Sequence, residues 1–398
     1  MKRRELLKGI AGLTAMAIGP AADSFASSRA PLAVKPLPAG RQIRVSLAGV
    51  RKGAPEKTLQ AAVRESASEA TDFSWMSKGD AVFIKPALNS GIPYPSTTSP
   101  LAVAAMVGLL RDKGAARVIV GDMCGIEHVK LSPDGLSGSS RRLMEASGMA
   151  EAARTAGAEL HFFEEAGWDG FYEDPLASGD HWKRGLMMPR ILKEVDHIIL
   201  MPRCARHVLA GSTLGLKAAV GYWRTDTRLE YHRDADSFHE KTAEANTAET
   251  LLAKQRLVLS AADKILTTFG PDEGYVHHPE IGLIIASESV VAHDMVSLAW
   301  LLESRRRVPS EEQDGFIDHS PFVAGMANHW VTFKLGGLRA AIISDKLIKN
   351  DLKTLGGDRV LNRAYAILGG TPNVDIHAAN GMLPEELKRT LGEMTAVT

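Results

Sequence analysis

The chain has 398 residues, of which 45% are hydrophobic and 24% charged, a composition typical of folded globular proteins rather than disordered ones. The 47 basic and 47 acidic residues leave a formal net charge of zero, so no excess of charge points to nucleic acid as a partner. Two cysteines are too few for a disulfide-rich scaffold, a zinc ribbon or a self-contained iron–sulfur cluster.

Residues 1–26 are predicted to be an export signal. A basic start that includes Arg3 and Arg4 precedes a short apolar run at residues 9–19, and Ser24 and Ala26 supply the small residues that signal peptidase recognises. The run RRELLKG resembles a twin-arginine signal, which predicts a periplasmic protein that meets the twin-arginine translocase during export. An ordinary secretory signal is the alternative.

Residues 27–40 contain three prolines and are predicted to be a linker. No later apolar stretch is long enough to span a bilayer, so no membrane span is expected in the mature chain. Beyond the linker, strand-like apolar runs alternate with helical patterns. Strands are predicted at residues 43–50, 81–84, 117–120, 159–163, 197–200 and 282–286, and helices at 55–71, 100–114, 139–157 and 290–302.

This alternation predicts an α/β fold, Rossmann-like, in which a mostly parallel sheet carries helices on both faces. Residues 41–302 are expected to form the α/β domain, with an irregular excursion at residues 168–190 that suggests a hairpin. Residues 303–398 are expected to form a mostly helical C-terminal extension.

Polar side chains follow four of the predicted strands, where parallel sheets bind their ligands. We therefore expect them to share one site, although a helix cap or a turn is the ordinary role of a single such residue. The four groups are Lys85 with Asn89; Asp122 with Cys124; Arg203, Cys204, Arg206 and His207; and Glu288 with His293 and Asp294.

The densest group of cations lies in residues 201–221. Cations beside a helix N-terminus suit a carboxylate or a phosphate, so these side chains are expected to act on ligand affinity rather than on folding. A solvated basic loop beside a capped helix is the alternative. The segment contains Arg203, Arg206, His207 and Lys217, with Ser212 or Thr213 as the cap. No P-loop and no GxSxG motif occurs, which disfavours nucleotide hydrolysis and a serine hydrolase.

Three further hypotheses concern chemistry at these positions. Arginines that flank Cys204 would lower the pKa of its thiol and make it a nucleophile, and Cys124 and Cys204 either pair across the crevice or are unrelated. His232 and His239 lie two helical turns apart, so both would share a face of a continuous helix and could bind a transition metal. A solvent-exposed histidine is the more ordinary interpretation.

Together these motifs resemble the domain of unknown function 362 family. The matching stretches are GDAVFIKPALN, TTSPLAVAAMVGLLRDKGAARVIVGD, MEASGM, HIILMPRCARH, TLGLKAAVG, GPDEG and IIASESVVAHDMVSLAWLL, which extend over residues 80–302. The resemblance implies an α/β fold and a site at the strand ends. Many relatives carry an appended ferredoxin-like cysteine cluster that this chain lacks. The TTSP turn also resembles the N-terminal half of nickel-dependent lactate racemases, which implies a carboxylate substrate and a metal-bearing cofactor.

The resulting functional hypothesis is an exported enzyme that acts on a small anionic substrate, carboxylate or phosphate, with or without a metal. Substrate binding is assigned to Lys85, Asn89, Arg203, Arg206, Thr213 and Lys217, and catalysis to His207, Asp122, Cys204 and Asp294. A non-catalytic periplasmic binding protein and a cofactor-maturation factor are the alternatives.

Overall fold

The computed structural model describes residues 42–350 and 352–396. The predicted signal at residues 1–26 and the linker at 27–40 lie outside the described residues. Within them, no helix has both the length and the apolar character needed to cross a membrane.

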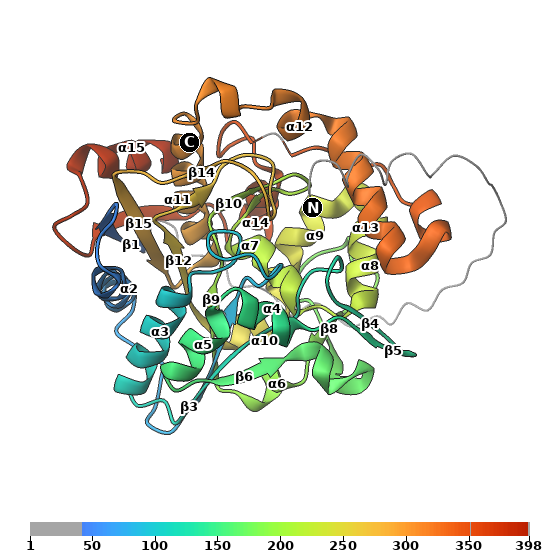
Figure 1. Cartoon of the computed structure of the whole chain (residues 1–398), viewed down its shortest axis with the longest axis horizontal. Helices are drawn as coiled ribbons and strands as arrows, with labels where there is room; N and C mark the ends of the chain where they lie inside the picture. The colour runs from blue at the N-terminus through green and yellow to red at the C-terminus, as the bar shows by residue number, and fades with distance from the viewer. Residues whose placement is uncertain (1–41, 351, 397–398) are drawn as a thin grey trace.

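An eight-stranded sheet forms the centre of the fold (Figure 1). Five of its neighbouring strand pairs are parallel, and only the two pairs that involve β15 are antiparallel. The predicted α/β fold with a mostly parallel sheet is therefore confirmed. In spatial order the strands are β16 (Asn373–Ala378), β1 (Gln42–Arg51), β15 (Ile281–Ser287), β12 (Gln255–Ala262), β9 (His197–Met201), β2 (Ala81–Pro86), β3 (Arg117–Asp122) and β6 (Glu159–Phe162).

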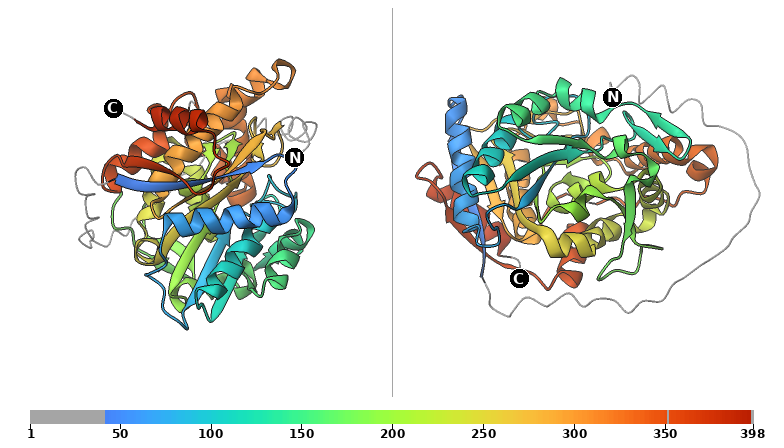
Figure 2. Two further views of the ribbon diagram at one scale, coloured as in Figure 1. Left: turned by 90° about the vertical axis from the view of Figure 1, so that its left-hand side faces the viewer. Right: turned by 90° about the horizontal axis from the view of Figure 1, so that it is seen from below.

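Helices pack on both faces of this sheet (Figure 2), as an apolar sheet requires. On one face lie α2 (Glu56–Ala70), α3 (Pro100–Asp112) and α5 (Met149–Thr155), and on the other α7 (Gly215–Ala218), α11 (Val290–Arg305) and α15 (Glu385–Thr395). Two large clusters of buried apolar side chains fill the spaces between sheet and helices. The remaining helices are α4 (Ser140–Ala146), α6 (Ile191–Glu194), α8 (Thr225–Arg233), α9 (Phe238–Glu244), α10 (Glu249–Lys254), α12 (Gly315–His319), α13 (Pro321–Ile342) and α14 (Arg359–Ile367).

Three small sheets surround the main one. The excursion at residues 168–190 contains the antiparallel pair β7 (Phe171–Asp174) and β8 (Leu186–Pro189), so the expected hairpin is present. A four-stranded sheet near the strand ends consists of β11 (Gly211–Thr213), β10 (Ala205–His207), β13 (Ile265–Leu266) and β14 (Val276–His277). The third is the hairpin of β4 (Lys130–Ser132) and β5 (Gly135–Ser137).

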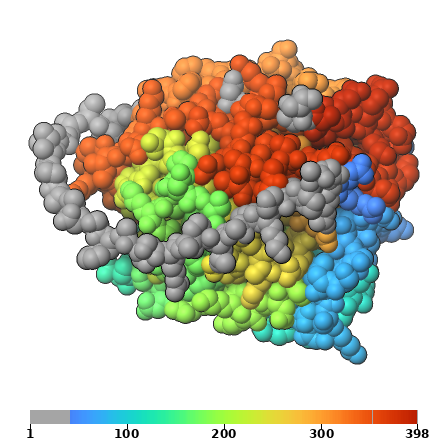
Figure 3. Space-filling model, turned by 180° about the vertical axis from the view of Figure 1, so that it is seen from behind, coloured from blue at the N-terminus to red at the C-terminus, as the bar shows by residue number. Residues whose placement is uncertain are grey.

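The main sheet and the helices beside it differ from the sequence predictions in three places. The helix expected over residues 139–157 is two helices, α4 and α5, because Gly148 between them has a φ of 79°, outside the helical region. Strand β12 was not predicted. The C-terminal region contributes strand β16 to the sheet beside β1, and Figure 3 shows red C-terminal residues against the blue N-terminal ones there.

Candidate functional site

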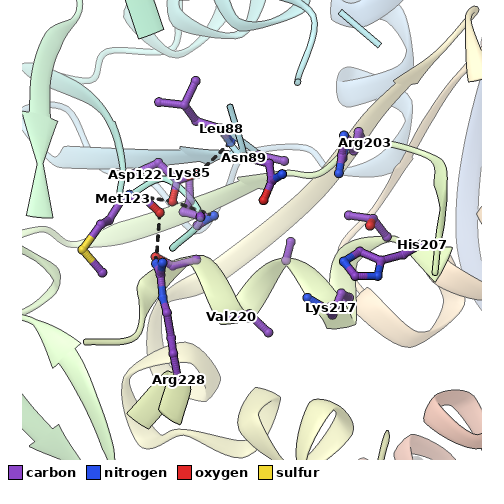
Figure 4. Close-up of a pocket in the computed structure, with 15 residues that line it drawn as sticks. Lys85, Leu88, Asn89, Asp122, Met123, Arg203, His207, Lys217, Val220 and Arg228 are labelled. Carbon is purple, nitrogen blue, oxygen red and sulfur yellow. Dashed lines mark hydrogen bonds and ion pairs between the residues drawn. The ribbon is translucent and has the colours of Figure 1, made fainter. Parts of the chain in front are cut away.

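A cavity of about 90 Å³ lies beyond the carboxyl ends of the adjacent parallel strands β9, β2 and β3, and we call it the inner cavity. It is the place where a parallel sheet is expected to bind a ligand. Seven of the candidate site residues line it: Lys85, Asn89, Asp122, Arg203, His207, Thr213 and Lys217, all but Thr213 labelled in Figure 4. Members of three of the four predicted strand-end groups therefore lie together at this edge of the sheet, whereas the group of Glu288, His293 and Asp294 does not.

Lys85 and Asp122 form a buried ion pair on one wall of the inner cavity. The Lys85 Nζ lies 3.0 Å from Oδ1 of Asp122, and each side chain is only 2% exposed. Burial lowers the pKa of Lys85 and raises that of Asp122, while their mutual attraction opposes both shifts. The backbone N–H groups of Leu88 and Met123 also donate to the Asp122 carboxylate, at 2.8 Å each. Both carboxylate oxygens of Asp122 therefore already accept hydrogen bonds.

Two buried arginines line the same cavity. Arg203 donates to the carbonyl oxygens of Ser96 and Pro271, and Arg228, from α8, donates to those of Met123, Cys124 and Gly221. Neither guanidinium contacts a carboxylate oxygen among the described residues. The Nε atoms of both arginines and the buried hydroxyl of Thr213 have no hydrogen-bond partner within the described ranges. Buried polar groups are rarely left so, but these three atoms are themselves closed off from the cavity space.

Lys217 is the cation with the fewest contacts. Its Nζ lies 5.8 Å from the centre of the Tyr231 ring, and no hydrogen bond to it occurs among residues 42–350 and 352–396. Burial, together with the charges of Arg203, Arg228 and Lys85, lowers the pKa of Lys217 to about 7. The side chain therefore gains and loses its charge close to neutral pH.

Two neutral histidines present opposite hydrogen-bonding properties. Nδ1 of His207 accepts from the N–H groups of Leu209 and Ala210, at 3.1 and 3.4 Å, so Nε2 carries the ring proton. Burial and the charge of Lys217 hold the pKa of His207 well below its ordinary value. Nδ1 of His232 donates to Oδ1 of Asn328 at 2.8 Å, and burial lowers its pKa to about 3, so its Nε2 is an unprotonated acceptor.

A second, larger space of about 370 Å³ opens from the inner cavity, and we call it the outer cavity. The two adjoin, since they share the lining residues Asn89, Gly125, His207, Lys217, Val220 and Arg228. The outer cavity is additionally lined by His232, by residues of the loop at 269–273 and by one face of helix α13.

Arg206 does not line either cavity, contrary to the sequence prediction. Its Nε lies 2.9 Å from Oδ1 of Asp318 in α12, and its guanidinium also donates to the carbonyl oxygens of Gly211 and Asp318 at 2.7 Å each. Side chains alternate along a strand, so Arg206 points away from its neighbour His207 in β10. Arg206 connects the β10–β11 hairpin to α12.

Asp294 is also outside both cavities. Its carboxylate accepts from the N–H groups of Gly215 and Leu216, at 2.7 Å each, and thereby caps helix α7. The anion that was expected at this helix N-terminus is thus a side chain of the protein itself, and neither Ser212 nor Thr213 is the cap. Glu288 lies at the far edge of the sheet, where it accepts from Thr71, because β15 is antiparallel to its neighbours.

The two cysteines are free and buried in different apolar clusters, so they do not form a disulfide. Burial raises the pKa of both thiols, and the Sγ of Cys204 donates to the carbonyl of Ser297. The lowered thiol pKa expected from flanking arginines is absent, because Arg206 is paired with Asp318 and Arg203 with carbonyl groups. Cys204 does not have the surroundings of a nucleophile.

His232 and His239 lie on two helices, α8 and α9, so the continuous helix that would place both on one face is not formed. Nε2 of His239 hydrogen-bonds the carbonyl of Ile348 at 2.7 Å. The one group of three ligand-type side chains found among the described residues is Asp180, His181 and Glu244. Arg363 already pairs with both of these carboxylates, at 2.6 and 2.7 Å, and so supplies the positive charge that a metal would bring.

Sequence reasoning missed Arg228, the fourth cation of the inner cavity. It lies in the middle of the polar helix α8, whose sequence TDTRLEYHR follows no strand and has no distinctive spacing. Four cationic side chains and one carboxylate line the inner cavity, so it suits an anion, and it repels a bare divalent cation.

A family model described as "Domain of unknown function (DUF362)" matches residues 82–299, which include every residue that lines the inner cavity. No curated protein matches the chain. One similar solved structure is a protein from Thermotoga maritima, with 12% identity, a TM-score of 0.38, and coverage of 65% of this chain and 59% of that one. Another is the lactate racemase apoprotein from Thermoanaerobacterium thermosaccharolyticum, with 13% identity, a TM-score of 0.38, and coverage of 63% and 54%. The chain thus spans less than two thirds of either protein.

Proposed function

Because the chain belongs to the domain of unknown function 362 family, whose description names no reaction, we propose its function from the inner cavity itself. The protein is an enzyme that binds the carboxylate or phosphate group of a small molecule there and transfers a proton to or from it. The observation that carries this proposal is the group of Arg203, Lys217 and Arg228 around one small space, with no carboxylate bonded to any of them among the described residues.

An anion in the inner cavity would lie among several donors. They are the Lys217 ammonium, the Nε2–H of His207 and the guanidinium groups of Arg203 and Arg228. Charge-assisted hydrogen bonds from several such donors are the usual means by which proteins hold carboxylates and phosphates.

Lys217 is the residue suited to proton transfer. With a pKa of about 7 in the empty site, the side chain is present both as ammonium and as amine at neutral pH. A bound anion favours the ammonium, so Nζ would give its proton to the bound substrate and remain as the neutral amine. His207 keeps its Nδ1 engaged by two backbone N–H groups, so it serves as a neutral hydrogen-bond donor rather than a base.

Acetate binding is expected to weaken as pH rises from about 6 to about 9, by at most about tenfold per unit above pH 7, because Lys217 loses its charge in this range. Titration calorimetry at constant ionic strength measures the affinity, and buffers of different ionisation enthalpy reveal proton uptake on binding. Acetate keeps its own charge throughout, whereas phosphate does not, so phosphate is compared at one pH only.

Lys217→Met is the matched variant for this experiment. Its acetate affinity is expected to be at least about tenfold weaker at pH 6 and independent of pH. The pKa of Lys217 in the folded protein, about 7, lies below the ordinary lysine value of 10.5, so its ammonium destabilises the empty protein at pH 7, and this effect fades as pH rises toward 10.5. The empty variant should therefore melt no lower than wild type. Absence of acetate and phosphate binding to wild type would refute the proposed function.

We also propose that the protein is exported to the periplasm by the twin-arginine pathway, on the sequence of residues 1–26 alone. Replacing Arg3 and Arg4 by lysine is expected to leave the precursor in the cytoplasm, because that pathway depends on the arginine pair. Fractionation followed by immunoblotting measures the distribution, with Lys8→Arg as the control that keeps the charge and the pair. Undiminished periplasmic protein in the double variant would rule this pathway out.

A further inference from the structure

The outer cavity has a composition different from that of the inner one. Its wall includes one face of helix α13, formed by Ala327, Trp330, Val331 and Leu335 at the spacing of successive helical turns. Val208, Leu209 and Phe269 line it as well. The anion-binding space therefore continues into a mostly apolar chamber of about 370 Å³.

Helix α13 is held over this chamber by polar contacts to α8. Asn328 donates to the backbone carbonyl of His232 at 2.8 Å, and Thr332 donates to the same carbonyl at 3.2 Å. Figure 1 shows the two helices side by side. The indole N–H of Trp330 is buried and has no partner within residues 42–350 and 352–396. The hydrogen bonds of Asn328 and Thr332 thus hold the apolar wall of α13 in place.

Charge is distributed unevenly between the two ends of the combined space. Lys85 and Arg203 line only the inner cavity, and Lys217 and Arg228 line both cavities. The carboxylates of Glu127, Asp272 and Glu273 line only the outer cavity. An anionic group is therefore attracted inward and repelled from the outer wall. A ligand with one acidic end and one apolar end can enter in a single orientation only.

We propose that the natural ligand is an amphipathic acid: an anionic group in the inner cavity, joined to an apolar body, such as an aromatic ring, in the outer cavity against Trp330, Val331 and Leu335. This inference rests on the proposed function, since it takes the anion site as given, and adds the class of substrate. The apolar wall of α13 then determines specificity, because small acids such as acetate leave it in contact with water.

The test compares acetate, phenylacetate and 2-phenylethanol as ligands of the full-length protein by titration calorimetry at constant pH and ionic strength. Phenylacetate is expected to bind at least about tenfold more tightly than acetate, since its ring is removed from water in the outer cavity. The alcohol, which has the ring but no charge, is expected to bind at least about tenfold more weakly than phenylacetate.

Trp330→Ala and, independently, Leu335→Ala are expected to remove most of the preference for phenylacetate while leaving acetate affinity within about twofold of wild type. Phe322→Ala is the control, because Phe322 lies on the same helix, is 64% exposed and does not line the cavity. Its affinity for phenylacetate should equal that of wild type.

Three outcomes separate this inference from the proposed function. Equal affinities for acetate and phenylacetate would overturn the inference and leave the anion site standing. Binding of 2-phenylethanol as tight as that of phenylacetate would also overturn the inference, because the carboxylate would then contribute nothing to the binding of the ring. No binding of either acid would overturn the proposed function itself.

Discussion

Replacing Arg206 by glutamine is expected to destabilise the folded protein by about 3 kcal/mol, although sequence analysis places this residue in the ligand site. Arg206 is 1% exposed, and its partner Asp318 is 5% exposed. Removal of the guanidinium takes one donor from the Asp318 carboxylate and one from the carbonyl of Gly211, both in the protein interior. Asp318 keeps its ion pair with Arg305, at 2.6 Å. The expected loss of folding free energy therefore lies at the lower end of the range for removing one partner of a buried ion pair.

Urea-induced unfolding of the empty protein measures this effect. Arg307→Gln is the matched control, because Arg307 also pairs with a carboxylate, that of Glu303, but its side chain is 68% exposed. Exposed pairs contribute less than about 1 kcal/mol, so the control should unfold near the wild-type midpoint. A wild-type unfolding free energy for Arg206→Gln would show that Arg206 is not a structural residue.

Asp122→Asn is expected to cost about 3–5 kcal/mol, because it removes one half of the buried Lys85–Asp122 pair. The isosteric change is harmful for a second reason. Oδ1 accepts from Met123 N and from Lys85 Nζ, while Oδ2 accepts from Leu88 N, so both oxygens face donors. Either orientation of the asparagine amide turns its NH₂ group toward another N–H.

Glu159→Gln serves as the control, since its pair with Arg117 has side chains 51% and 49% exposed, and less than about 1 kcal/mol is expected. Lys85→Met combined with Asp122→Asn should recover part of the lost stability, because the unpaired buried ammonium is then gone. If Asp122→Asn alone unfolds at the wild-type urea concentration, the ion pair contributes nothing and Asp122 is free for a catalytic role.

The position of the site could be predicted from the sequence because it depends on strand ends. The apolar runs that precede Lys85, Asp122 and Arg203 are short and continuous, which is typical of buried parallel strands, and their carboxyl ends had to meet if the strands were neighbours. The structure makes β9, β2 and β3 neighbours. Nothing beyond pattern and topology is needed to bring these residues together.

The direction of β15 could not be predicted in the same way. Its apolar run GLIIA is equally compatible with parallel and antiparallel pairing. The direction of β15 is set by its packing between β1 and β12. Glu288 was misplaced for this reason. Arg206 was misplaced because three-residue strands such as β10 give too little alternation to show which neighbour faces the ligand. Arg228 depends on how α8 packs, a tertiary feature that helical sequence alone does not reveal.

The place of β1 in the sheet has a consequence for the order in which the protein folds. The strands β2, β3, β6 and β9 lie within residues 81–201, so they can associate while the chain is still being synthesised. β1 is made first but pairs only with β15 and β16, and Gly49 hydrogen-bonds Asn380 across a separation of 331 residues. β1 must therefore wait for β15, more than 200 residues later, before it can join the sheet, and such long-range pairing is expected to be slow.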